Sequence, residues 1–311
     1  MSWIIVRNMM KKIEIIFNRI IRHTRWYNDK FWNGALKFGR QTFNTEIVCL
    51  GSGAAVHDFN FEGLQLKGAN WALSPQSLVH DYSILRNYFS YLKEGAVVII
   101  TICPFSCLYS HYSETHNFKY YPFLHPATIL NFDDSERTRA FLVYQNPFKV
   151  MPVYCIKSTI KEIIYNIKHF FLCHKHTPNF VKSAENILNG WMNQFNIKDL
   201  EAPLSSCHQK EKESRKKTLI EMIVFCKERN LNPIIVIPPM HAELVNRFPS
   251  LFLKNYINDF LLGIDVKVYD CMNCKIVNEN KYFENALFLN QLGAKMFTNW
   301  FVDELKKDYT L

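Results

Sequence analysis

Four short apolar runs, rich in β-branched residues and bounded by turn residues, constrain the fold of this chain most. They cover residues 46–50, 96–102, 233–237 and 266–269, with a weaker fifth candidate at 63–67. Uninterrupted apolar runs of this length are typical of strands that are buried on both faces of a parallel sheet. The segments between them have the 3.6-residue apolar spacing of helices. Strands that alternate with helices predict an α/β fold, a three-layer sandwich in which helices cover both faces of the sheet.

The expected helices of this sandwich are long and lie between the strands. They cover residues 77–93, 211–229, 242–262 (broken around Pro249) and 291–307. Residues 104–208 interrupt the alternation, because they are rich in aromatic residues, histidine and proline; we expect an insertion that caps the strand ends, with helices near 158–173 and 183–195. The expected organisation is therefore an N-terminal amphipathic helical segment (1–44) followed by one α/β domain (45–311) that contains this insertion.

The charge of the chain, a formal +9 with a pI near 9.0, would suit an acidic partner. The densest charged run, residues 210–217, is mixed in sign and is typical of a solvated helix. Zinc-finger spacing, a glycine-rich phosphate loop and an RNA-binding aromatic signature are all lacking, so we expect no nucleic-acid partner.

The pair Cys271-Met-Asn-Cys274 has no second pair, and we expect neither a metal nor a cofactor. The nine scattered cysteines suit a reducing compartment.

The N-terminal segment mixes isoleucine, phenylalanine and methionine with basic residues between Trp3 and Trp26. No signal-peptide pattern follows, and no run of about 18 uncharged apolar residues predicts a membrane-spanning helix. We therefore expect a cytoplasmic protein. Three roles for the segment stay open: a basic amphipathic helix on a membrane surface, a helix packed on its own domain, and a helix packed on a second subunit of an oligomer.

Polar or glycine-containing loops follow the predicted strands, at the edge of a parallel sheet where ligands bind. After the first strand, Ser52 stands between Gly51 and Gly53. A serine at such a turn can attack an ester carbonyl, and neighbouring N–H groups can stabilise the oxyanion; a simple cap of the next helical turn is the alternative. After the second strand, the side-chain amide of Asn70 could complete an oxyanion hole.

Near the C-terminus, residues 289–298 read Leu-Asn-Gln-Leu-Gly-Ala-Lys-Met-Phe-Thr. A Gly-Ser after the first strand, a Gly/Asn after the second and this late motif together resemble the SGNH/GDSL hydrolase superfamily. The similar branch occurs among bacterial surface-polysaccharide esterases and O-acyltransferases, and the resemblance covers residues 45–102 and 211–306. It implies a flavodoxin-like fold, with Ser52 as nucleophile of a Ser-His-Asp triad and Gly53 and Asn70 as oxyanion donors.

The acid and the base of that triad are replaced in this chain. The family's late motif begins Asp-x-x-His-Leu-Asn, whereas this chain has Asn285 and Phe288 at the Asp and His positions. General-base catalysis is worth about 10²–10⁴-fold in rate, so another base would be needed. His241, after the fourth strand, is the candidate, and the insertion offers His111, His116 and His125. A structural role for His241 is the alternative.

Two functions follow from these observations. The first is an SGNH-like esterase or O-acyltransferase that acts on a carbohydrate or a surface-polysaccharide precursor through Ser52. The second is a catalytically silent module of the same fold that binds a glycan or assembles with biosynthetic enzymes, as Asn285 and Phe288 would suggest. A flavodoxin-like cofactor binder is a third and weaker hypothesis, and flavin absorbance would test it.

Overall fold

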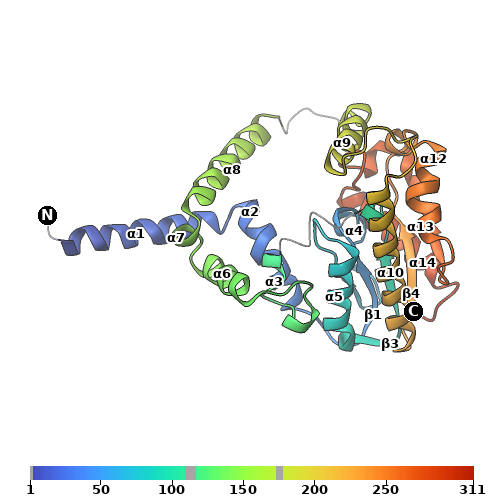
Figure 1. Cartoon of the computed structure of the whole chain (residues 1–311), viewed down its shortest axis with the longest axis horizontal. Helices are drawn as coiled ribbons and strands as arrows, with labels where there is room; N and C mark the ends of the chain where they lie inside the picture. The colour runs from blue at the N-terminus through green and yellow to red at the C-terminus, as the bar shows by residue number, and fades with distance from the viewer. Residues whose placement is uncertain (1–2, 109–116, 173–177) are drawn as a thin grey trace. The chain divides into compact units, whose positions relative to one another are not determined.

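The computed structural model describes residues 3–108, 117–172 and 178–311 (Figure 1). Internal contacts divide the chain into two compact units. Unit 1 combines Met1–Arg40 with His116–Thr177, and unit 2 combines Gln41–Thr115 with Pro178–Leu311. The expected insertion at 104–208 is therefore not one element. Its central part packs with the N-terminal segment, whereas its final part belongs to unit 2, which contains the sheet.

Unit 2 is an α/β unit built on a parallel sheet of five strands. These are β1 (Thr45–Leu50), β2 (Gly68–Asn70), β3 (Leu92–Thr101), β4 (Asn232–Ile237) and β5 (Val268–Asp270). Their spatial order is β2-β1-β3-β4-β5, which is the order of flavodoxin-type doubly wound sheets. In such sheets ligands bind beyond the carboxyl ends of the strands, where the order reverses. Here that point lies between β1 and β3.

Helices cover both faces of the sheet, as the alternation of strands and helices predicts. Side chains alternate along a strand, and Ile47 and Cys49 belong to a core that also contains Phe297 and Phe301 of α14 (Gln291–Leu305). The short helix α4 (Gly53–Asp58) packs against α14 on this face. The other two long helices, α5 (Leu78–Tyr88) and α10 (Ser206–Lys227), pack against each other, and α10 also packs on β4.

The predicted positions of the fifth strand and of the end of the first long helix were wrong. Residues 63–67 form turns, with Gly63 at φ +81°, and the strand follows at 68–70. The helix predicted to continue to Lys93 ends at Tyr88, and β3 already begins at Leu92. Gly95 lies inside β3, where its N–H donates to the Asn230 carbonyl at 2.8 Å.

The predicted break around Pro249 is confirmed. Helix α11 (Ala242–Val245) ends before Pro249, and α12 (Ser250–Leu253), a π-helical turn and α13 (Asp259–Leu261) follow it. The remaining short elements are single 3₁₀ turns at Phe89–Tyr91, Ser106–Leu108, Asn117–Lys119, Pro126–Thr128, Lys275–Asn278 and Asn280–Tyr282.

An aromatic cluster fixes α9 (Phe180–Gln194) to the core of unit 2. Phe105, in the loop after β3, is 1% exposed. Its ring centroid lies 5.1 Å from that of Trp191 on α9 and 5.0 Å from that of Phe252 on α12. Phe195 and Tyr256 complete the cluster at 5.3 and 5.6 Å. The end of the expected insertion is therefore part of the α/β core.

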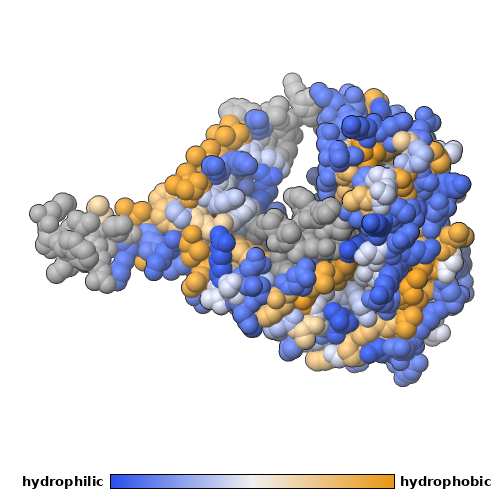
Figure 2. All heavy atoms as spheres, viewed as in Figure 1, coloured by the Kyte–Doolittle hydropathy of each residue, from blue (hydrophilic) through white to orange (hydrophobic). Residues whose placement is uncertain are grey.

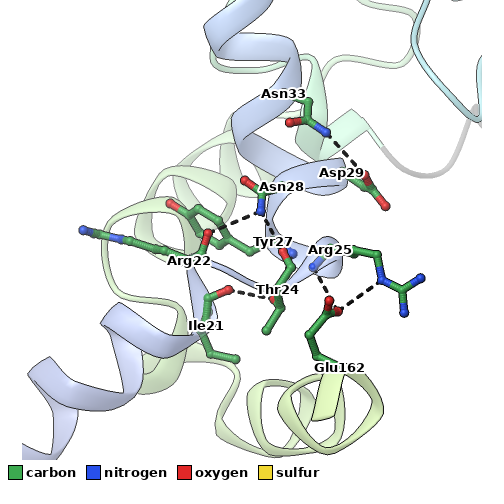
Figure 3. A network of polar contacts seen from close by, with 9 residues as sticks. All are labelled: Ile21, Arg22, Thr24, Arg25, Tyr27, Asn28, Asp29, Asn33 and Glu162. Carbon is green, nitrogen blue, oxygen red and sulfur yellow. Dashed lines mark hydrogen bonds and ion pairs between the residues drawn. The ribbon is translucent and has the colours of Figure 1, made fainter. Parts of the chain in front are cut away.

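Unit 1 is helical. Its longer elements are α1 (Trp3–Ile21), α2 (Arg25–Tyr27), a π-helical turn (Asn28–Trp32), α3 (Asn33–Phe38), α6 (Asp134–Gln145), α7 (Pro147–Val150) and α8 (Pro152–Leu172). Figure 3 shows how the turn after α1 reaches α8. Thr24 donates from Oγ1 to the Ile21 carbonyl at 2.7 Å and caps α2, while Arg25 pairs with Glu162 of α8 at 3.2 Å. Across residues 3–108, 117–172 and 178–311, no helix combines the length and the apolarity that a membrane span requires.

Candidate functional site

The turn after β1 requires glycine at its first position. Gly51 has φ +144°, and a Cβ there would lie 2.8 Å from the Ala55 Cβ and 2.9 Å from the Thr101 Cβ. Only glycine combines this backbone angle with so close an approach between α4 and β3. The turn places Ser52 at the N-cap position of α4, at the point where the strand order reverses.

The Ser52 hydroxyl does not cap α4. Its Oγ accepts a hydrogen bond from the backbone N–H of Gln76 at 3.1 Å, while the Ser52 carbonyl accepts from Val56. The Gln76 side chain donates to the Gly51 carbonyl at 3.1 Å and to Asp81. Within the part of the chain that the structure describes, Gln76 supplies the one hydrogen bond to Ser52 Oγ, and no imidazole does. No pattern in the sequence indicates this role of Gln76.

Phe288 lies against the residue that follows Ser52. A Cβ built on Gly53 would lie 3.0 Å from Cζ of Phe288 and 3.3 Å from the Ser74 hydroxyl. His57 of α4 stacks on the Phe288 ring, with centroids 4.4 Å apart. Its Nδ1 lies 3.8 Å from a carboxylate oxygen of Glu284. We did not predict a role for His57 from the sequence, although its place five residues after Ser52 was a usable signal.

Asn70 has a different role from the one that the family resemblance implies. It is the last residue of β2, and its Nδ2 donates to the carbonyls of Ala55 at 2.7 Å and Phe59 at 3.0 Å. Both amide hydrogens therefore satisfy carbonyls near the end of α4 that have no partner within the helix. Since Oδ1 accepts from the Ala72 N–H at 3.0 Å, the whole side chain is engaged. The oxyanion contact expected of Asn70 stays a prediction, and in this arrangement both of its amide hydrogens are donated elsewhere.

His241 makes structural contacts in this arrangement, and the base role that we expected for it stays a prediction. The side chain caps α11, with Nδ1 accepting from the Glu243 N–H at 3.2 Å. That contact leaves the proton on Nε2, which lies 2.8 Å from Oδ1 of Asn280. The ring is 5% exposed and stacks on Phe180 with centroids 4.1 Å apart. Both nitrogens are used, so no lone pair remains to take a serine proton.

The histidines of the insertion add no base to the described site. His111 and His116 lie outside the described residues. His125 belongs to unit 1, where it caps a 3₁₀ turn by accepting from the Ala127 N–H at 3.2 Å.

The late motif holds α14 in place. Asn290 caps α14 by accepting from the Gly293 N–H at 2.9 Å, and Gly293 lies against the Tyr282 carbonyl. Thr298 accepts from the Asn60 N–H at 2.9 Å, which ties α14 to the end of α4. Asn285 accepts from the N–H groups of Leu287 and Phe288 at 2.9 and 3.0 Å. An aspartate there would keep both of these bonds, so the turn itself does not require asparagine.

Asp58 is the most strongly perturbed carboxyl group of the described residues. It is fully buried at the end of α4, and this burial raises its pKa well above the usual range. One carboxyl oxygen accepts from the Leu289 N–H at 3.0 Å, and Oδ2 has no partner. A raised pKa means that the folded protein holds this proton at a pH where the unfolded chain has lost it.

We expect Asp58→Asn to change the pH dependence of stability. In the wild type, the raised pKa of Asp58 makes the free energy of unfolding fall as the pH rises above about 4, by up to about 1.4 kcal/mol per pH unit, until the folded pKa is reached. The asparagine keeps the acceptor for Leu289 and removes this loss. Urea unfolding at pH 4.5, 6 and 7.5 should show a variant whose advantage grows with pH. If the stabilities of the wild type and of Asp58→Asn changed in parallel with pH, the raised pKa assigned to Asp58 would be contradicted. The control is Asp303→Asn, on the exposed side of α14.

The thiols of the Cys271–Cys274 pair are buried or half-buried. Burial raises the pKa of both thiols, that of Cys274 to about 11, so they stay protonated and poor nucleophiles at neutral pH. A search of the described ranges finds no group of three or more His, Cys, Asp or Glu side chains that could hold a metal ion.

A polar pocket of about 400 Å³ opens beside Phe288. One side is formed by α9 and the other by the segment that precedes α14; the lining residues are Asn179, Lys182, Ser183, Asn186, Ile187, Asn285, Leu287 and Phe288. A larger and more apolar pocket of about 590 Å³ lies beside Tyr282 and Trp300. Ser52, Gly53, Asn70 and His241 line neither pocket. The polar pocket is connected to the Ser52 turn through Phe288, which lines it and lies against Gly53.

A scan against protein-family models and a search of curated proteins found no match to this chain.

Proposed function

We propose that this protein is a catalytically silent SGNH-like module that binds a carbohydrate, a surface polysaccharide or its precursor, in the pocket beside Phe288. The observation behind this proposal is the contact of Phe288 with Gly53. A phenyl ring there can neither accept a proton nor orient a base, and it covers the residue whose N–H would bind an oxyanion.

The described contacts of the other expected catalytic residues support the same conclusion. Ser52 Oγ accepts from a backbone N–H, Asn70 is engaged with α4, and both nitrogens of His241 are used. Without a base, a serine hydroxyl at neutral pH is a weak nucleophile.

The lining of the polar pocket suits a sugar. Asn179, Asn186 and Asn285 have amides that both donate and accept, as sugar hydroxyls do. Phe288 and Ile187 add apolar surface for the faces of sugar rings. Lys182 adds a positive charge, which would favour an anionic sugar. The free thiols of the described cysteines agree with a protein of the cytoplasm, where polysaccharide precursors would be encountered before export.

Labelling with a fluorophosphonate probe tests whether the protein is silent. We expect no adduct at Ser52 in the folded wild-type protein, under conditions that label a serine hydrolase added to the same tube. Intact-mass and peptide analysis would locate any adduct. An adduct at Ser52 that is lost in Ser52→Ala would overturn the proposal.

A glycan array tests the binding. Sugars that bind the wild type should lose about five- to thirtyfold in affinity in Asn186→Ala, since hydrogen bonds of a bound polar group are worth about 1–2 kcal/mol. Gln194→Ala, at the other end of α9, is the matched control. Equal binding by the wild type, Asn186→Ala and Gln194→Ala would exclude this pocket as the sugar-binding site.

An esterase or O-acyltransferase with His57 as its base is the second candidate. His57 and Glu284 form an imidazole–carboxylate pair beside the Phe288 ring. Fluorophosphonate labelling of Ser52 that falls in His57→Ala would favour this candidate over the silent module.

A further inference from the structure

Two helices of unit 1 leave long apolar stripes uncovered. On α1, Met9, Ile13, Ile16 and Ile20 recur at intervals of three and four residues and are 40–57% exposed. On α8 the stripe is wider, and its six residues are 45–61% exposed: Val153, Ile156, Ile160, Ile163, Ile164 and Ile167. Intervals of three and four place each set on a single helix face.

The opposite faces of both helices are used for packing inside unit 1. On α1, Phe17 stacks on Phe148 with ring centroids 4.6 Å apart, and Asn18 bonds to Asn146 at 2.5 Å. On α8, Cys155 is fully buried and Glu162 holds Arg25 (Figure 3). The stripes are therefore the outer faces of helices that are already docked. In Figure 2 the stripe of α8 appears as an orange band along the edge of that helix.

Basic residues border each stripe. Lys157, Lys161 and Lys168 are exposed and share one face of α8, directly beside the isoleucines. On α1, Lys12 and Arg19 lie two turns apart along one edge of the stripe and are also exposed. The acidic residue of α8, Glu162, is on the inner side and is neutralised by Arg25. The outer face of α1 and the outer face of α8 are thus each apolar and flanked by positive charge.

We infer that unit 1 docks on an anionic lipid bilayer through the stripes of α1 and α8. An apolar helix face of this kind sinks into the boundary between headgroups and acyl chains, and lysines along its edge reach the lipid phosphates. A second copy of the chain is a poorer occupant, because a two-fold contact between stripes would bring the like-charged lysine rows together. The inference selects one of the three roles that stayed open for the N-terminal helix and adds α8 to it, and it does not depend on the proposed carbohydrate binding.

Vesicle co-sedimentation of the full chain tests the inference. In 0.1 M NaCl the protein should sediment with vesicles of phosphatidylcholine and phosphatidylglycerol at 3:1, and far less with phosphatidylcholine alone. The triple variant Lys157→Gln, Lys161→Gln, Lys168→Gln should lose roughly 100-fold in affinity, at about fivefold per charge. The triple variant Ile160→Ser, Ile164→Ser, Ile167→Ser should lose at least tenfold.

Matched controls change the same residue types on unit 2. Lys210→Gln, Lys254→Gln, Lys295→Gln removes three exposed charges, and Leu262→Ser, Leu292→Ser removes two exposed apolar side chains. Both controls should bind as the wild type does, and circular dichroism checks the fold of every variant.

Three results would overturn the inference. They are equal binding to neutral and anionic vesicles, no binding to either, and a dimer seen by light scattering that the isoleucine variant alone dissociates. The last result would assign the stripes to a contact between two copies of the chain.

Discussion

Replacing Gly293 with alanine should lower the free energy of unfolding by about 3 kcal/mol, because overpacking at a backbone contact leaves no flexible neighbour to move. A Cβ at Gly293 would lie 2.1 Å from the carbonyl oxygen of Tyr282. That carbonyl also accepts from the Asn290 N–H at 2.9 Å, so it cannot shift without disturbing the start of α14. Urea unfolding followed by circular dichroism measures the loss as a lower midpoint.

A second helical glycine supplies the control. Gly190 lies inside α9 and is exposed, and a Cβ built on it would meet no heavy atom of the described residues within 4 Å. Gly190→Ala should therefore raise stability by about 0.5–1 kcal/mol, since alanine favours the helix and restricts the unfolded chain. If the two variants shift the midpoint equally, the close contact at Tyr282 does not exist in solution.

Phe105→Ala should cost about 3–5 kcal/mol, the usual range for removing a buried phenyl ring. Phe105 joins α9 to the region after β4 through four aromatic neighbours, two on each side. The loss should be accompanied by faster amide hydrogen exchange in α9, because its main anchor is gone. Mass spectrometry of exchanged peptides would measure this.

The matched control removes an exposed phenyl ring of the same unit. Phe43 stacks on Tyr91 with centroids 4.5 Å apart but is 63% exposed. Phe43→Ala should cost less than about 1 kcal/mol and leave exchange in α9 unchanged. A loss equal to that of Phe105→Ala would contradict the role assigned to the cluster.

The sheet could be predicted from the sequence because its central strands are buried on both faces. From Ala96 to Ile100 of β3 and through most of β4 the residues are apolar, so the pattern is strong there. The predicted bounds of β4 are close to those observed, whereas β3 begins at Leu92, four residues before the predicted run. The edge strand β2 has only three residues, Gly68–Asn70, and no residue in it is fully buried. Its sequence contains no hydrophobic pattern, so the strand was predicted at the alternating residues just before it.

The location of the candidate site was predictable, whereas the contacts of its side chains were not. Gly51 and Ser52 follow a strong strand, and the topology of parallel sheets places them at the ligand edge. The hydrogen bonds that Asn70 and His241 make depend on turn geometry or on partners that are far away in the sequence. Asn280 is such a partner of His241. Hydrogen bonds of this kind leave no periodic signal in the chain.

The composition of unit 1 from two distant segments has a consequence for synthesis. Asn18 of α1 forms a hydrogen bond with Asn146, which follows it by 128 positions. The ring of Phe123 packs directly against Gly34. The first 40 residues leave the ribosome early, yet their packing partners emerge only after β1, β2 and β3 have been made. The N-terminal helices therefore lack these packing partners while three of the five strands of the sheet are translated.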